Sequence, residues 1–221
     1  METEFWLSKW QKNEIGFHLA KPHPWLVEFW PRFTQDSTAK NVFIPLCGKT
    51  LDIDYLLQKG HNITANELSE DAIKAMFERI QLSPSITKWA GGLCYQAENI
   101  TVYVGDFFKL DERHIHDIDV VYDRAAIIAL PPLMRKDYSQ HIMALTLGAQ
   151  QCVITLDYDQ ALMSGPPFSV TQIELEQHYA NNYDIEPIKH NDIIEHEPKF
   201  KQNGLPYLMQ GLYRLTAKSH P

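Results

Sequence analysis

The chain has 221 residues, of which 44% are hydrophobic and 22% are charged, as in an ordinary globular protein. Its formal net charge of -8 argues against a nucleic-acid-binding protein, because such proteins present a basic surface. The three cysteines show no disulfide or zinc-ligand pattern, and the chain has no signal-like start. No apolar stretch reaches membrane-spanning length. We therefore expect a cytoplasmic protein that binds neither nucleic acid nor membrane.

Apolar runs alternate with helical patterns along the chain, which predicts an α/β fold with a mostly parallel, Rossmann-like sheet and helices on both faces. The seven expected strands lie near 41–46, 62–67, 100–105, 118–123, 151–157, 184–192 and 207–217. The expected helices lie at 3–12, 50–59, 70–80, 133–147 and 171–180. No helical pattern separates the last two strands, so we expect an antiparallel C-terminal hairpin.

The domain organisation follows from the same pattern. We interpret residues 1–221 as one domain, with residues 1–40 as an N-terminal helical cap and residues 41–221 as the sheet region. Residues 34–40 are polar, which is typical of a linker between the cap and the sheet.

Two strand ends carry the strongest functional signal. The apolar run 41–46 breaks at a turn that contains Gly48, and the run 62–67 ends in Glu67. In a Rossmann-like sheet, the first turn brings the backbone close to a nucleoside, and the acid accepts hydrogen bonds from both ribose hydroxyls. The pattern therefore predicts a nucleoside-binding crevice.

The number of glycines in this turn limits which nucleoside-containing ligands fit it. Gly48-Lys49-Thr50 resembles the end of a phosphate-binding loop, but the glycine that such a loop needs five residues earlier is replaced by Phe43. A dinucleotide site needs three glycines at fixed spacing, and only Gly48 is present. S-adenosylmethionine carries adenosine without phosphate, so it fits a turn with less glycine.

Short motifs along nearly the whole chain point to one enzyme family. They are Phe5-Trp-Leu-Ser-Lys-Trp10, Ile15-Gly-Phe-His18, Pro45-Leu-Cys-Gly-Lys-Thr50 with Asp52, Gly60-His61, Glu67-Leu-Ser69 and Asp123-Arg124-Ala125-Ala126. Their order and spacing resemble thiopurine S-methyltransferase, a family of small class I enzymes. The resemblance implies methyl transfer from S-adenosylmethionine to the sulfur of a small thiol, by a monomer that uses no metal.

The resemblance also implies roles for individual residues. Trp10 and Leu46 are expected at the methionine end of the cofactor and Glu67 at the ribose. Asp106 and Phe107 are expected to flank the adenine. Arg124 is expected to pair with the cofactor carboxylate or to line the acceptor site, and Phe17 is expected to touch the acceptor.

Simpler interpretations of these residues stay open at this point. Trp10 and Trp6 fit an ordinary amphipathic stripe, because aromatic stripes are usually core. Asp106 fits a turn cap, and Arg124 fits a local ion pair with Asp123.

No residue is assigned an acid–base role, because a soft, partly ionised sulfur needs mainly to be held in line with the methyl group. A solitary His18 is more often structural. The alternatives are a methyltransferase for oxygen or for selenium or tellurium species, and a non-enzymatic S-adenosylmethionine-binding protein.

Overall fold

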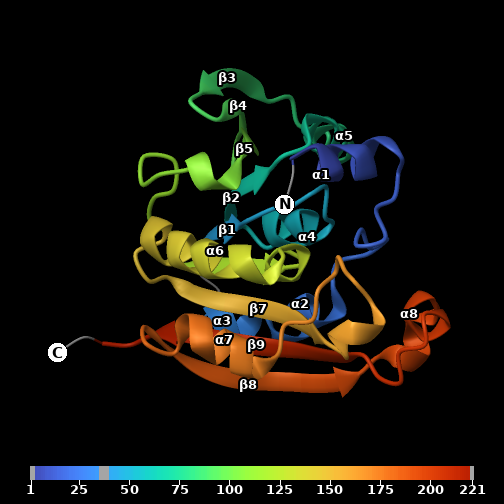
Figure 1. Cartoon of the computed structure of the whole chain (residues 1–221). Coiled ribbons are helices and arrows are strands. Elements are labelled where there is room, and N and C mark those ends of the chain that lie inside the picture. The colour runs from blue at the N-terminus through green and yellow to red at the C-terminus, as the bar shows by residue number, and fades with distance from the viewer. Residues whose placement is uncertain (1–2, 35–39, 220–221) are drawn as a thin grey trace. The chain divides into compact units, whose positions relative to one another are not determined.

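The alternating pattern forms the predicted α/β fold, with a mostly parallel sheet and an antiparallel C-terminal hairpin. The computed structural model describes residues 3–34 and 40–219, and these contain nine strands. The prediction of seven strands is wrong because it omits a hairpin within residues 85–97. The chain forms two compact units, residues 1–122 and 123–221, and Figure 1 labels their elements.

Four parallel strands, in the order β5-β2-β1-β6, form the centre of the first unit. Their bounds are β1 Asn41–Ile44, β2 Asn62–Glu67, β5 Ile100–Gly105 and β6 Val120–Arg124, the last of which continues into the second unit. The apolar residues Val42 to Ile44 are all buried, as expected for a strand with a parallel neighbour on each side. Parallel pairing also brings the carboxyl ends of β1 and β2 to the same edge, where Glu67 lies.

The described part of the first unit also contains five α-helices and one short 3-10 helix. They are α1 Thr3–Gln11, α2 Pro24–Phe29, α3 Pro31–Thr34, α4 Asp52–Gln58, α5 Glu70–Ile80 and the 3-10 helix η1 Phe107–Lys109. The predicted bounds of α5 are confirmed, and the cause is local. The Ser69 hydroxyl caps the helix by accepting the Ala72 N–H at 3.2 Å, and Ala72, Ile73, Met76 and Phe77 bury one face.

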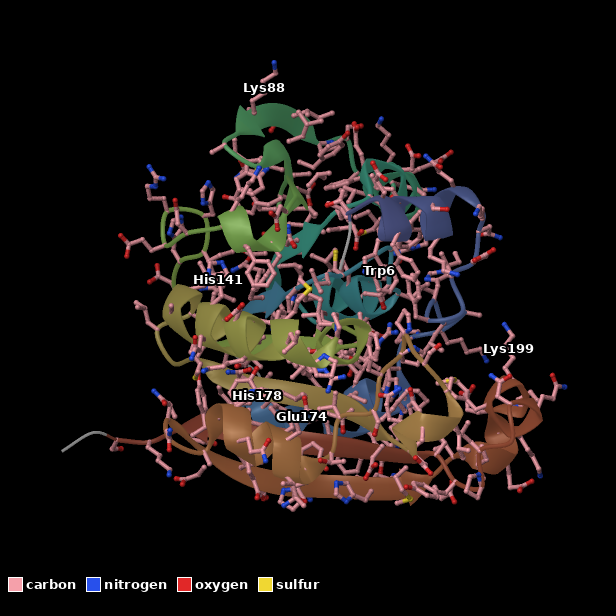
Figure 2. The ribbon with its side chains drawn as sticks, in the orientation of Figure 1. Trp6, Lys88, His141, Glu174, His178 and Lys199 are labelled. Carbon is pink, nitrogen blue, oxygen red and sulfur yellow. The ribbon has the colours of Figure 1, made fainter. Side chains whose placement is uncertain are left out.

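The additional hairpin consists of β3 Ser85–Trp89 and β4 Gly92–Ala97, and β4 pairs with β5. Residues 85–88 of β3 are all exposed, and Lys88 extends into solvent in Figure 2. An exposed edge strand needs no alternation of apolar and polar residues, so the sequence pattern does not reveal it. The Trp89 indole N–H holds the hairpin against β5 through the carbonyl of Val104, at 3.2 Å.

Three antiparallel strands form the sheet of the second unit, in the order β7-β9-β8. Their bounds are β7 Gln150–Asp157, β8 Tyr183–Asp192 and β9 Met209–Ala217. Because β9 pairs antiparallel with both neighbours, the predicted C-terminal hairpin is confirmed. The expectation that no helix separates its two strands is wrong, because the short helix α8 Pro198–Gln202 lies between β8 and β9. The pairing of β8 shifts register between Pro187 and Lys189, and proline has no amide to donate to a strand ladder.

The second unit also contains α6 Pro132–Leu145, α7 Gln172–Tyr179, α8 Pro198–Gln202 and the 3-10 helices η2 Ile127–Ala129, η3 Gln160–Leu162 and η4 Ile194–His196. Arg135 of α6 is only 1% exposed, and its Nη1 lies 2.5 and 2.7 Å from the two carboxylate oxygens of Glu174 on α7. Figure 2 shows His178 next to Glu174, and its Nε2 lies 3.4 Å from the same carboxylate. A buried guanidinium needs such partners, so this ion pair fixes α6 against α7.

Two statements about organisation rest on the sequence alone. Of the predicted linker at 34–40, residues 35–39 lie outside the described residues, and Thr34 is the last residue of α3. The single domain with a cap at residues 1–40 stays a prediction. Among the described residues, no helix has the length and apolar character needed to cross a membrane.

Candidate active site

The turn after β1 has an unusual backbone. Leu46 and Gly48 have φ angles of +46° and +56°, in the left-handed region that costs most residues energy. The Cys47 N–H donates to the carbonyl of Asn66 at 2.8 Å, which ties the turn to the end of β2. A Cβ at position 48 would lie 3.1 Å from the Trp10 ring, so glycine meets both the backbone angle and the close approach of the cap.

Glu67, the last residue of β2, is buried with 6% exposure. Its Oε2 accepts the Gly48 N–H at 2.7 Å, its Oε1 accepts the Ser69 N–H at 2.8 Å, and the Trp10 side chain donates a further hydrogen bond. Burial raises the pKa of the Glu67 carboxyl, and the hydrogen bonds from these donors oppose that rise. The carboxylate is therefore fixed between the turn and the cap.

Aromatic side chains of the N-terminal segment cover the turn. The ring centroids of Trp10 and Phe17 lie 5.5 Å apart at an interplanar angle of 80°, and Trp6 packs on Phe17 at 5.8 Å. A Cβ at Gly48 would lie 3.8 Å from the Phe17 ring. The structure thus brings together four of the residues that the sequence singled out: Trp10, Phe17, Gly48 and Glu67.

Asp106 and Phe107 follow β5, the neighbour of β2. Asp106 is exposed, and its carboxylate caps the 3-10 helix η1 by accepting the Phe108 N–H at 3.0 Å. Phe107 is buried with 4% exposure. The turn cap that the sequence left open is therefore present, and a contact of either residue with adenine stays a prediction.

Arg124 ends β6 and is partly exposed. Ala125 follows with a φ of +64°, and the fully buried Asp123 closes the turn: its Oδ1 accepts the Ile127 N–H at 3.1 Å and its Oδ2 accepts the Tyr138 hydroxyl at 2.8 Å. Burial raises the pKa of Asp123 to about 6, against these hydrogen bonds. Asp123 thus fixes the backbone of the turn that directly follows Arg124.

Two buried polar residues of the first unit were not predicted to support the site. Asn66 donates from Nδ2 to the carbonyls of Tyr103 and Gly105, at 2.9 and 3.0 Å, and so joins the ends of β2 and β5. Asp52 accepts the His23 N–H at 2.7 Å and anchors the segment that leads into α2 to the start of α4. Asp52 belongs to one of the short sequence motifs, whereas the only sequence signal for Asn66 is a polar residue inside a predicted strand.

Comparison with solved structures identifies the class of the fold. The chain resembles a Burkholderia thailandensis 1,6-didemethyltoxoflavin-N1-methyltransferase that was solved with S-adenosylhomocysteine. The TM-score is 0.64 and the sequence identity is 16%, and the match covers 97% of this chain and 87% of that one. An Anabaena variabilis S-adenosylmethionine-dependent methyltransferase matches with a TM-score of 0.62 and 14% identity, covering 98% of this chain and 95% of that one. The fold is that of a class I methyltransferase.

Comparison of sequences gives the family. The model of the thiopurine S-methyltransferase family matches residues 1–218. A thiopurine S-methyltransferase of Pseudomonas fluorescens SBW25 is 40% identical over 99% of this chain and 100% of its own length. A probable thiopurine S-methyltransferase of Yarrowia lipolytica is 39% identical over 93% of this chain and 95% of its own length. The chain belongs to the thiopurine S-methyltransferase family, which confirms the predicted family, the methyl-transfer activity and the S-adenosylmethionine donor.

Proposed function

We propose that this methyltransferase transfers the methyl group to the sulfur of small aromatic or heterocyclic thiols such as thiopurines. The observation that carries the donor side of the proposal is the meeting of Gly48, Glu67 and Trp10 at the carboxyl ends of β1 and β2. The names of the family and of its relatives support the class of acceptor.

The residues around Gly48 suit an adenosine ligand without phosphate. Glu67 accepts hydrogen bonds only, and its two oxygens have about four acceptor sites. The amides of Gly48 and Ser69 use one site on each oxygen, and the Leu68 amide and the Trp10 side chain donate further hydrogen bonds. The ribose hydroxyls therefore need the hydrogen bond from Trp10 to be released before they bind the carboxylate.

Further contacts of the cofactor and the acceptor are proposed residue by residue. Trp10 and the backbone of Leu46 hold the methionine end of the cofactor. Asp106 and Phe107 flank the adenine, Phe17 touches the acceptor, and Arg124 pairs with the cofactor carboxylate or lines the acceptor site. Family resemblance supports these roles. The clustering of Trp10 and Phe17 at Gly48 also supports the roles proposed for Trp10 and Phe17.

The mechanism needs positioning more than acid–base chemistry. When bound, S-adenosylmethionine supplies a methyl group on a positively charged sulfur. The turn at residues 46–48 and Glu67 orient the donor, while Trp10 and Phe17 present aromatic surface that suits a cation and keeps water out. A thiol ionises more readily than a phenol, whose pKa is about 10, so the acceptor itself supplies the nucleophile once the two sulfurs are held in line with the methyl carbon.

Product formation is the experiment that tests the proposal. The protein is incubated with methyl-labelled S-adenosylmethionine and matched thiols, phenols, amines and inorganic selenium or tellurium species. We expect methylated aromatic thiols, and phenols of the same shape turned over at least about ten times more slowly, because no base is assigned to ionise them. A phenol methylated as fast as its thiol analogue would contradict the proposal. Methylation of selenium or tellurium species alone would show that these, and not thiols, are the acceptors.

Replacement of Arg124 with lysine is expected to impair the enzyme although the charge is kept. A planar guanidinium makes two parallel hydrogen bonds that an ammonium does not reproduce, so we expect the KM of the donor or of the acceptor to rise by about tenfold. Arg113→Lys is the control, because Arg113 is an exposed residue paired with Asp111. If Arg124→Lys matches the parent in both KM values, Arg124 has only a structural role.

We also infer that the protein acts as a monomer in the cytoplasm, in agreement with the family resemblance. Neither property enters the mechanism proposed above.

A further inference from the structure

Arg79 lies in the last turn of α5, far along the chain from the turn after β1, yet its side chain reaches that turn. Its Nη1 donates to the carbonyl of Lys49 at 2.8 Å, and its Nη2 donates to the carbonyl of Thr50 at 3.2 Å. One guanidinium therefore holds two successive carbonyls of the segment that directly follows Gly48.

The same guanidinium pairs with Asp54 in the first turn of α4. Its Nε lies 3.0 Å from Oδ1 and its Nη2 lies 2.6 Å from Oδ2, which is a two-pronged pairing. The side chains of Arg79 and Asp54 are 27% and 22% exposed. Since the carboxylate orients the plane of the guanidinium, Asp54 directs the remaining N–H groups at the two carbonyls.

These contacts join the two parts of the candidate cofactor site. Helix α5 follows β2, so its backbone continues from Glu67 through the cap residue Ser69. The turn held by Arg79 carries Gly48, whose N–H donates to Glu67. Arg79 thus bridges the helix that follows the ribose-binding acid and the turn that approaches the ligand.

We propose that Arg79 is a positioning residue for cofactor binding, which fixes residues 48–50 at the distance from Glu67 that the donor requires. The inference rests on the proposed cofactor site. Arg79 itself is not a catalytic residue, because it acts on the turn through backbone carbonyls. A positive charge at a helix C-terminus is also favourable in itself, and a lysine retains that effect while it loses the fork.

The test measures Kd for S-adenosylhomocysteine by calorimetry, together with KM for donor and acceptor, in Arg79→Lys and in Asp54→Asn. We expect Arg79→Lys to raise the Kd and the donor KM by about tenfold, with the acceptor KM and the kcat at saturating donor changed less than about twofold. Asp54→Asn is expected to act in the same direction with a smaller effect, because the guanidinium loses its orientation.

The matched control is Arg214→Lys, which keeps the charge but loses the guanidinium that pairs with Glu186, at a comparable side-chain exposure of 28%. Equal Kd values for the parent and Arg79→Lys, with a melting temperature lowered as in Arg214→Lys, would overturn the inference and leave Arg79 a structural residue. A Glu67 variant separates this failure from a failure of the site: if Glu67→Ala also binds like the parent, the proposed cofactor site is wrong. If only Arg79→Lys binds like the parent, the site stands without this role of Arg79.

Discussion

Replacement of Glu67 with alanine is expected to raise the Kd for S-adenosylhomocysteine by roughly 10- to 150-fold. The loss of charge-assisted hydrogen bonds from two ribose hydroxyls costs about 1.5–3 kcal/mol, which corresponds to that range. The variant also leaves the buried Gly48 amide without its acceptor at 2.7 Å, so the turn loses order along with the ligand contact. The acceptor KM at saturating donor is expected to change much less.

Two further variants test whether the effect belongs to the Glu67 carboxylate. Glu67→Gln keeps one carbonyl oxygen as an acceptor, so it is expected to bind more tightly than Glu67→Ala and more weakly than the parent. Glu78→Ala removes an exposed acid of α5, the helix that follows β2, and is expected to leave the Kd unchanged. A folded Glu67→Ala protein with the affinity of the parent would remove Glu67 from the site.

The second large effect concerns Asp123 and the pH dependence of stability. Burial is the main cause that raises the folded-state pKa of this carboxyl to about 6 from its ordinary value of 3.8. A raised folded pKa means that the folded state binds the proton more tightly than the unfolded state. The stabilising contribution of protonation is therefore complete below the unfolded value and is lost as the pH rises through about 6.

Asp123→Asn removes this titration. Relative to the parent, the variant is expected to gain about 2–3 kcal/mol of unfolding free energy between pH 4 and pH 7.5, since each pKa unit corresponds to about 1.4 kcal/mol. Urea unfolding of both proteins across that range measures the difference. Asp137→Asn, which makes the same change of charge at an exposed position of α6, is the control for the change in net charge. Parallel stability curves for the parent and Asp123→Asn would show that Asp123 does not titrate in this window.

Most of the fold could be predicted from the sequence because its central elements carry strong local signals. The strands at 62–67 and 100–105 and the helix at 70–80 have the predicted bounds. The hairpin β3-β4 has an exposed edge strand, and α2 and α3 are only six and four residues long. Such elements depend on tertiary contacts and not on periodicity, so the sequence pattern does not predict them.

The site was predictable to the extent that its residues lie at strand ends or in motifs. Gly48 and Glu67 meet because parallel strands end at one edge, and Trp10 reaches them from the cap. Arg79 was not predictable, because its partners at residues 49, 50 and 54 lie 25 to 30 positions away and no local pattern encodes that contact. The buried amide of Asn66 was missed for the same reason.

In the proposed reaction, the acceptor's own ionised sulfur attacks a methyl group that the protein holds in line. The most direct measurement is the pH dependence of kcat/KM for a series of aromatic thiols whose acidities differ, at saturating S-adenosylmethionine. We expect the rate to rise through the pKa of each thiol, so that the midpoint moves with the acceptor. A midpoint that stays fixed across the series would contradict this account and would indicate an ionising group of the enzyme, with His18 the first residue to replace.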